Sequence, residues 1–161
     1  MPGTTASARI SLREATDDDH AFLVALYGST RTDLALLPLD EEQRDALVRM
    51  QFHAQDVHYR QTSPHASFGI VDVDGRAAGR LYVDRTAGDI RIIDITLLPA
   101  LRGGGIGRAL IQQLLDEAAS TARTVSLHVA MGNAAEALYA RLGFQLIADD
   151  GVYRLMEWRA P

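Results

Sequence analysis

Apolar positions along this chain recur with a period of two in some segments and with a helical period in others, which predicts alternating strands and helices. The alternating segment 8–16 predicts a strand, and the aspartates after it introduce a helix over roughly residues 20–27. A second helix is predicted from the segment LDEEQRD to about residue 61. Its predicted apolar stripe consists of Leu47, Met50, Ala54 and Val57.

The second half of the chain shows turn signals that separate short apolar segments. Asp74-Gly75 joins two strands in a predicted hairpin, and the β-branched segment after it predicts a central strand. The predicted elements are, in order, strands over 66–73, 77–84 and 90–98, a helix from about 106 to 120, a strand over 124–130, a helix over 133–143 capped by Asn133 and Gly143, and a hairpin over 144–158.

The predicted order, β-α-α-β-β-β-α-β-α-β-β, is typical of a mixed α/β fold. We expect about seven strands in a mostly antiparallel sheet that is parallel in its middle, with helices on both faces. A length of 161 residues with 47% apolar composition predicts a single domain over 1–161. The first nine residues lack an apolar targeting region, and no apolar run reaches about 18 residues, so a soluble cytoplasmic protein is expected.

Charge and cysteine content narrow the candidate chemistry. The net charge of −5 argues against nucleic acid and anionic membranes as partners, so any anion site must be built locally. The absence of cysteine excludes disulfides, thiolate metal sites and a cysteine nucleophile. His53 and His58 lack the spacing of a zinc motif, so no metal is expected.

Three consecutive glycines precede the predicted helix at residue 106, in the segment LRGGGIGRAL. A P-loop would need Lys and then Ser or Thr where Arg108 and Ala109 stand. A dinucleotide fingerprint would need a third small residue where Leu110 stands. A turn without any ligand stays an alternative. Against it, Arg102 and Arg108 flank a helix N-terminus, where a cation costs about 0.3–1 kcal/mol unless an anion is bound there.

Two segments of the chain resemble the signatures of the GNAT N-acetyltransferase family. Arg102, Gly105 and Gly107 match the acetyl-CoA signature R/Q-x-x-G-x-G/A, and Pro99 precedes it as in the family. The segment NAAEALYARLGF, residues 133–144, matches the second signature, although Tyr139 follows Asn133 by six residues where many members have seven. Both signatures occur in the family's order, and the elements of the remaining chain agree.

The resemblance implies a sheet that splays between its fourth and fifth strands, with the pantetheine of acetyl-CoA in the gap. It implies that Asn133 contacts the cofactor and that Tyr139 is the general acid beside the thioester sulfur. The cofactor-binding residues that the resemblance implies on the strand and the glycine loop are Ile95, Thr96, Leu97, Arg102, Gly103, Gly104, Gly105, Ile106, Gly107 and Arg108.

Two residues are candidates for the general base. Asp94 lies on the predicted fourth strand, and alternation places it on the same face as Ile92 and Thr96. His128 lies on the fifth strand, at a position similar to a glutamate that some relatives use as base, and an imidazole titrates near pH 6.5. The alternative for each is a structural role as a hydrogen-bonded strand residue. In similar proteins the second-helix region shapes the acceptor side, which here contains Arg31, Phe52, Tyr59 and Arg60.

These observations predict an N-acetyltransferase that transfers an acetyl group from acetyl-CoA to a primary amine of a small molecule or peptide, by direct attack in a ternary complex. One alternative is a sensor or partner-binding module that keeps the acyl-CoA cleft without catalysis. Another is an enzyme with a different acyl group or a hydroxyl acceptor. The sequence leaves open the acceptor and whether the chain forms a homodimer.

Overall fold

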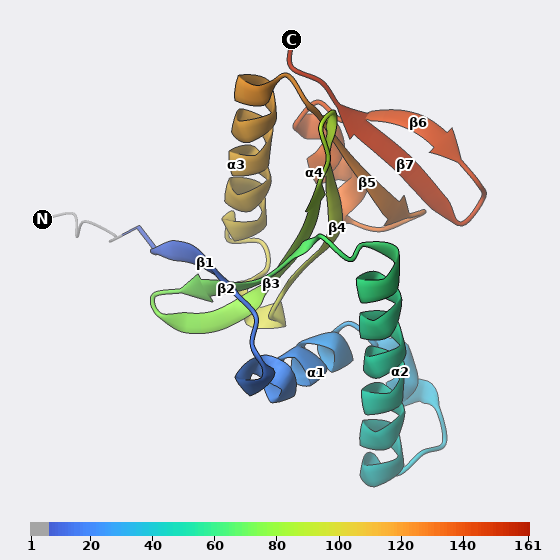
Figure 1. Ribbon diagram of the computed structural model, residues 1–161. Helices are drawn as coiled ribbons and strands as arrows, with labels where there is room; N and C mark the ends of the chain where they lie inside the picture. Colours follow the sequence, from blue (N-terminus) through green and yellow to red (C-terminus); the bar gives the residue numbers. More distant parts are fainter. Residues whose placement is uncertain (1–6) are drawn as a thin grey trace, which may run out of the picture.

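The computed structural model describes residues 7–161, and its seven strands form one sheet with the order β1-β2-β3-β4-β5-β7-β6 (Figure 1). Only β4 and β5 are parallel; all other neighbours are antiparallel. The strands are β1 (Ile10–Glu14), β2 (Ser67–Val73), β3 (Arg76–Arg85), β4 (Asp89–Leu97), β5 (Thr124–Ala130), β6 (Gln145–Asp149) and β7 (Tyr153–Trp158). The helices are α1 (His20–Ser29), α2 (Glu41–Thr62), α3 (Ile106–Thr121) and α4 (Ala135–Arg141).

The predicted order of strands and helices is confirmed, as are the parallel pair in the middle of the sheet and the helices on both faces. Short 3-10 segments, which the sequence pattern did not predict, occur at Asp17–Asp19, Thr32–Leu36 and Pro99–Leu101. The N-terminal segment in which we expected no targeting region lies largely outside the described residues. Among residues 7–161, no helix combines the length and the apolar character that a membrane span requires.

Helix α2 buries a different face from the predicted one. Met50 of the expected apolar stripe is 62% exposed, and Ala54 and Val57 also face solvent. Phe52 is the buried residue of this helix and packs against Tyr27 of α1. The predicted stripe is therefore wrong at Met50, Ala54 and Val57, because α2 instead packs Phe52 and the partly buried Val48 against the smaller apolar cluster.

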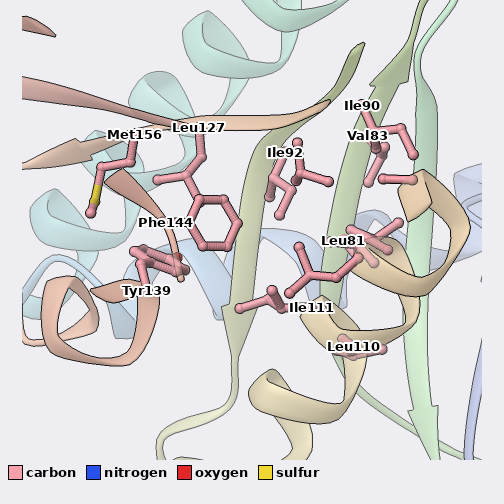
Figure 2. Packing of buried hydrophobic residues seen from close by; sticks show 14 of the residues in the cluster. Leu81, Val83, Ile90, Ile92, Leu110, Ile111, Leu127, Tyr139, Phe144 and Met156 are labelled. Carbon is pink, nitrogen blue, oxygen red and sulfur yellow. The ribbon is translucent and has the colours of Figure 1, made fainter. Parts of the chain in front are cut away.

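Two apolar clusters hold the helices to the two faces of the sheet. The larger cluster joins α3 and α4 to one face, and Figure 2 shows its residues from β3, β4 and β5 next to Leu110 and Ile111 of α3. The smaller cluster joins α1 and α2 to the other face through Ile70 and Phe52. Because Ile70 and Val71 follow each other on β2, they point to opposite faces and belong to different clusters.

The sheet opens between β4 and β5, as the resemblance implied. The two strands pair only from Asp89 to Ile92 on β4, although β4 continues to Leu97. From Asp94 onward β4 pairs with β3 alone. One backbone edge of the second half of β4 is therefore left without a partner strand in the described part of the chain, and this edge borders the gap.

A β-bulge in β4 changes which side chains share a face. The register with β3 runs Tyr82 to Asp94 and then Val83 to Ile92, so Ile93 is the extra residue. Ile92 faces the α3 cluster, whereas Asp94 bonds Tyr59 of α2 on the opposite face. The expectation that Asp94 shares a face with Ile92 is therefore wrong, because strict alternation fails at the extra residue.

Candidate active site

The glycine segment forms a loop whose backbone amides are free to bind a ligand. Gly103 and Gly105 have φ values of +77° and +87°, which residues with a side chain rarely adopt, and Gly105 caps α3. Within residues 7–161, no protein acceptor pairs with the backbone N–H groups of residues 103–108, whereas the next amide, that of Ala109, bonds to the carbonyl of Gly105. Six consecutive donors at a helix N-terminus make a site for a phosphate or pyrophosphate.

Two arginines flank this loop. In the part of the chain that the structure describes, neither Arg102 nor Arg108 has a carboxylate within 4.0 Å. The first turn of α3 contains no acidic residue either. Two exposed cations thus stand at the positive end of a helix, and a bound anion would turn this unfavourable arrangement into a favourable one.

The open edge of β4 leads from the loop into the gap between β4 and β5. Ile95, Thr96 and Leu97 lie on this edge, beyond the last pair with β5. Arg102 folds back so that its Nε donates to the carbonyl oxygen of Leu97 over 3.1 Å. The predicted strand and loop residues therefore form one continuous backbone surface, which offers amides and carbonyls to an extended ligand.

The second signature segment forms α4 on the other side of the gap. The helix begins at Ala135 with Ala134 as its N-cap and ends at the C-cap Leu142, so each predicted cap lies one residue outside the observed one. The Oδ1 atom of Asn133 accepts a hydrogen bond from the backbone N–H of Ala135, and Gly143 with φ +98° follows the C-cap. This bond turns the Asn133 oxygen toward its own helix. Its predicted contact with the cofactor stays a prediction.

Tyr139 projects from α4 into the α3 cluster and lies within electrostatic range of Asp94. The residue is 6% exposed, and its ring lies beside Phe144 with 5.6 Å between the ring centroids (Figure 2). Burial, followed by the nearby Asp94 carboxylate, raises the pKa of Tyr139 above its ordinary 10. The phenol therefore stays protonated at neutral pH, which a proton donor requires.

Asp94 is the centre of a charged network on the α2 side of the sheet. Its carboxylate accepts two bonds from Arg80, at 3.1 and 2.8 Å, and one each from Tyr59 at 3.0 Å and Thr96 at 2.7 Å. Arg80 is 3% exposed and also bonds Gln55 of α2. Four donors thus occupy the carboxylate oxygens of Asp94, and the network ties the β4 bulge to α2.

Next to this network, a groove of about 720 Å³ lies between the C-terminal part of α2, β4, β5 and the turn from β6 to β7. His128 lines it from β5, on the face opposite Val129 of the α3 cluster. The His128 Nδ1 lies 3.5 Å from the Nη1 of Arg91. Ile93, which lines the groove, is the first residue of β4 beyond the last pair with β5, so the groove adjoins the gap there.

The residues that were predicted to shape the acceptor side do not all line the groove. Tyr59 lines the groove, whereas Phe52 belongs to the smaller apolar cluster and the Arg60 guanidinium stacks over Phe68. Arg80 and Arg91 were not among the residues predicted from the sequence. A charged residue in the middle of an apolar strand, as Arg80 is, was the signal that could have indicated a buried partner.

The fold is similar to those of several solved acetyltransferases. The PaiA N-acetyltransferase from Thermoplasma acidophilum, solved in complex with coenzyme A, superposes with a TM-score of 0.68 and 17% identity, over 94% of this chain and 99% of that one. An acetyltransferase from Thermus thermophilus superposes with a TM-score of 0.68 and 17% identity, over 94% of this chain and 97% of that one. YncA from Salmonella typhimurium, a protein described as a putative acetyltransferase and solved with its cofactor acetyl-CoA, superposes with a TM-score of 0.57 and 20% identity. The match covers 95% of this chain and 98% of that one.

The sequence itself matches a family model for the acetyltransferase (GNAT) family over residues 33–144, more than two thirds of the 161 residues. This range contains the glycine loop, both halves of the opened strand pair and the whole of α4. The chain therefore belongs to the acetyltransferase (GNAT) family.

Proposed function

We propose that this protein transfers the acetyl group of acetyl-CoA to a primary amine by direct attack, in a complex that holds both substrates at once. The observation that carries the proposal is the free backbone surface formed by the glycine loop and the open edge of β4, which ends beside Tyr139 and the groove. Family membership supports acetyl transfer, and the structures solved with coenzyme A or acetyl-CoA support the donor.

On the donor side, the amides of residues 103–108 bind the pyrophosphate, and Arg102 and Arg108 add positive charge. The edge at Ile95, Thr96 and Leu97 pairs with the amides of the pantetheine, as an added strand would. Pairing at Leu97 competes with Arg102 for the same carbonyl, so Arg102 is released from Leu97 toward the phosphates. This arrangement directs the thioester to the point where β4 and β5 separate.

On the acceptor side, the amine must lose a proton before or during its attack. An alkyl amine with a pKa of about 10.4 is neutral in roughly one molecule in 2,500 at pH 7, a deficit of about 4.6 kcal/mol. His128 faces the groove and takes this proton, directly or through a water. Asp94 positions the bulge and does not act as the base, because its carboxylate oxygens already accept four hydrogen bonds, two of them from the guanidinium of Arg80.

On the leaving side, the thiolate must be protonated as the carbon–sulfur bond breaks. Tyr139 donates this proton, since it lies within electrostatic range of Asp94 on β4 and its raised pKa keeps the phenol protonated. The amine proton thus passes to the imidazole of His128, and the O–H proton of Tyr139 passes to the thiolate of coenzyme A. No covalent intermediate with the protein forms.

Thiol release over a panel of primary amines tests the proposal, because the chain contains no cysteine and coenzyme A is the only thiol in the assay. We expect acetyl-CoA, but not free acetate, to raise the melting temperature, and at least one amine to give turnover. Binding of acetyl-CoA without turnover for any amine would favour a sensor. The absence of binding would contradict the proposal as a whole.

Replacing Gly105 with alanine should weaken the binding of acetyl-CoA about tenfold or more. With φ at +87° an added Cβ is strained, and a change of φ would turn the neighbouring amides away from the pyrophosphate. Gly75→Ala is a matched control, since Gly75 has φ +80° and equally open surroundings in the turn between β2 and β3. Both variants should lose about 1–2 kcal/mol of stability. Isothermal titration with acetyl-CoA checks the difference, and equal affinities would contradict the site.

A further inference from the structure

The guanidinium of Arg91 on β4 is held by a hydrogen bond at its Nε, whereas its two outer nitrogens have no carboxylate partner among residues 7–161. Its Nε donates to the Oγ of Ser126 over 3.1 Å, and Ser126 is 3% exposed. Ser126 in turn donates to the Oδ2 of Asp89 over 2.5 Å. A buried hydroxyl thus anchors the Nε side of the guanidinium, and Arg91 lines the groove with its Nη1 beside His128.

The outer amino groups of Arg91 have no anionic partner. Within residues 7–161 no carboxylate lies within 4.0 Å of them, although Asp84 is its direct cross-strand neighbour, because the arginine leans toward β5. The other groove carboxylates already have neutral donors: Asp89 has two hydroxyls, and Asp150 has two backbone amides. Apart from the approach of Nη1 to His128, the N–H groups of Nη1 and Nη2 remain as donors that a carboxylate can accept from.

The position of Arg91 relative to His128 restricts the acceptor further. The two side chains approach to 3.5 Å, so a carboxylate on Arg91 lies immediately beside the imidazole. In an α-amino acid, only one carbon separates the carboxylate from the amine. A carboxylate bound by Arg91 therefore places the α-amine next to His128, whereas an amine at the end of a long chain would be carried past it.

The groove also suits the remaining parts of such an acceptor. Asp84 and Asp150 supply negative charge that attracts an ammonium, so a molecule with both signs is favoured over a simple anion. A volume of about 720 Å³ leaves room for a side chain between Tyr59, Ile93 and Tyr153. We infer that the acceptor is a free α-amino acid, bound through its carboxylate by Arg91 with its amine beside His128. This inference rests on the proposed function.

The test compares each of the common α-amino acids with its amide and with the amine that lacks the carboxylate, by thiol release and by the melting temperature of the coenzyme A-saturated protein. Three variants accompany the wild type: Arg91→Gln, Arg91→Lys, and the exposed control Arg76→Gln. We expect at least one α-amino acid to be preferred over its amide by about tenfold to a hundredfold in kcat/KM. Arg91→Gln should raise KM for that amino acid by the same factor and leave KM for the amide unchanged.

Arg91→Lys should recover part of the preference, because a lysine keeps the charge without the fork. Arg76→Gln should behave as the wild type, and neither Arg91 variant should bind acetyl-CoA more weakly. Equal use of the amides by the wild type, an unchanged preference in Arg91→Gln, or no turnover and no stabilisation with any α-amino acid would each overturn the inference. Loss of acetyl-CoA binding by the wild type would instead contradict the proposed function.

Discussion

Tyr139→Phe should lower kcat about 10²- to 10³-fold while the affinity for acetyl-CoA changes less than twofold. The substitution removes only the hydroxyl, so the ring keeps its contact with Phe144 and the α3 cluster keeps its packing. A positioned general acid contributes about 10²- to 10⁴-fold, and it acts on the leaving group in the transition state and not on the bound thioester. Steady-state kinetics and titration with acetyl-CoA measure the two quantities separately.

The pH dependence gives a second signature of Tyr139. Burial and the Asp94 carboxylate raise its pKa, so the protonated phenol persists to a higher pH than in an exposed tyrosine. In the wild type, kcat should therefore fall only above pH 10, and this alkaline decrease should be absent from Tyr139→Phe. A decrease centred below pH 9 that both proteins share would belong to another group.

Tyr27→Phe is the matched control for the loss of a buried phenol hydroxyl. Tyr27 is 8% exposed on α1, its ring belongs to the smaller apolar cluster, and its hydroxyl accepts a hydrogen bond from Arg31. We expect this variant to lose about 1 kcal/mol of stability and to keep its kcat. If Tyr139→Phe turns over within threefold of the wild type, Tyr139 is not the general acid.

The elements that the sequence predicted correctly are those whose signal is local. Asp74-Gly75 marks a hairpin within two residues, and Gly105 marks the start of α3 through its need for a positive φ. The β4 bulge has no such signal, because every residue from Ile90 to Leu97 is compatible with a regular strand. The extra residue follows from the register with β3, which is a long-range property.

The donor side of the candidate site has a local sequence signal, whereas the groove on the acceptor side has none. The donor side is one continuous segment from β4 through the glycine loop, so its backbone chemistry could be predicted before the fold was known. The groove is assembled from α2, β3, β4, β5 and the β6–β7 turn, and its side chains face one another only after the sheet has formed. Arg91, His128 and Asp150 all line the groove, but Arg91 and Asp150 are 59 positions apart in the sequence and share no motif.

Arg80→Met should lower the free energy of unfolding by about 3–5 kcal/mol, because it leaves the Asp94 carboxylate without its guanidinium partner. Burial acts to lower the pKa of Arg80, but the Asp94 carboxylate outweighs it and the net shift is upward. Asp94→Asn should cost a similar amount, since it leaves a charged arginine that is 3% exposed. Denaturant unfolding at pH 7 measures both variants.

The double variant Arg80→Met/Asp94→Asn separates the ion pair from the rest of the network. The asparagine oxygen can still accept from Tyr59 or Thr96, and no unpaired charge is left inside the fold. We therefore expect the double variant to be more stable than either single variant, with a coupling energy of about 2 kcal/mol or more. Additive losses would contradict the assignment of the pair as the anchor of the bulge.

The exposed pair of Arg159 and Glu157 gives the comparison that fixes the scale. Its distance of 2.7 Å is even shorter than the 2.8 Å of Arg80 and Asp94, but the Arg159 side chain is 75% exposed. Glu157→Gln should therefore cost less than about 1 kcal/mol. If contact distance alone set the contribution to stability, the Arg159–Glu157 pair would contribute more than the Arg80–Asp94 pair. A loss in Arg80→Met at least three times that in Glu157→Gln would show that burial, through the cost of an unpaired charge, is what makes the Arg80–Asp94 pair hold β4 to α2.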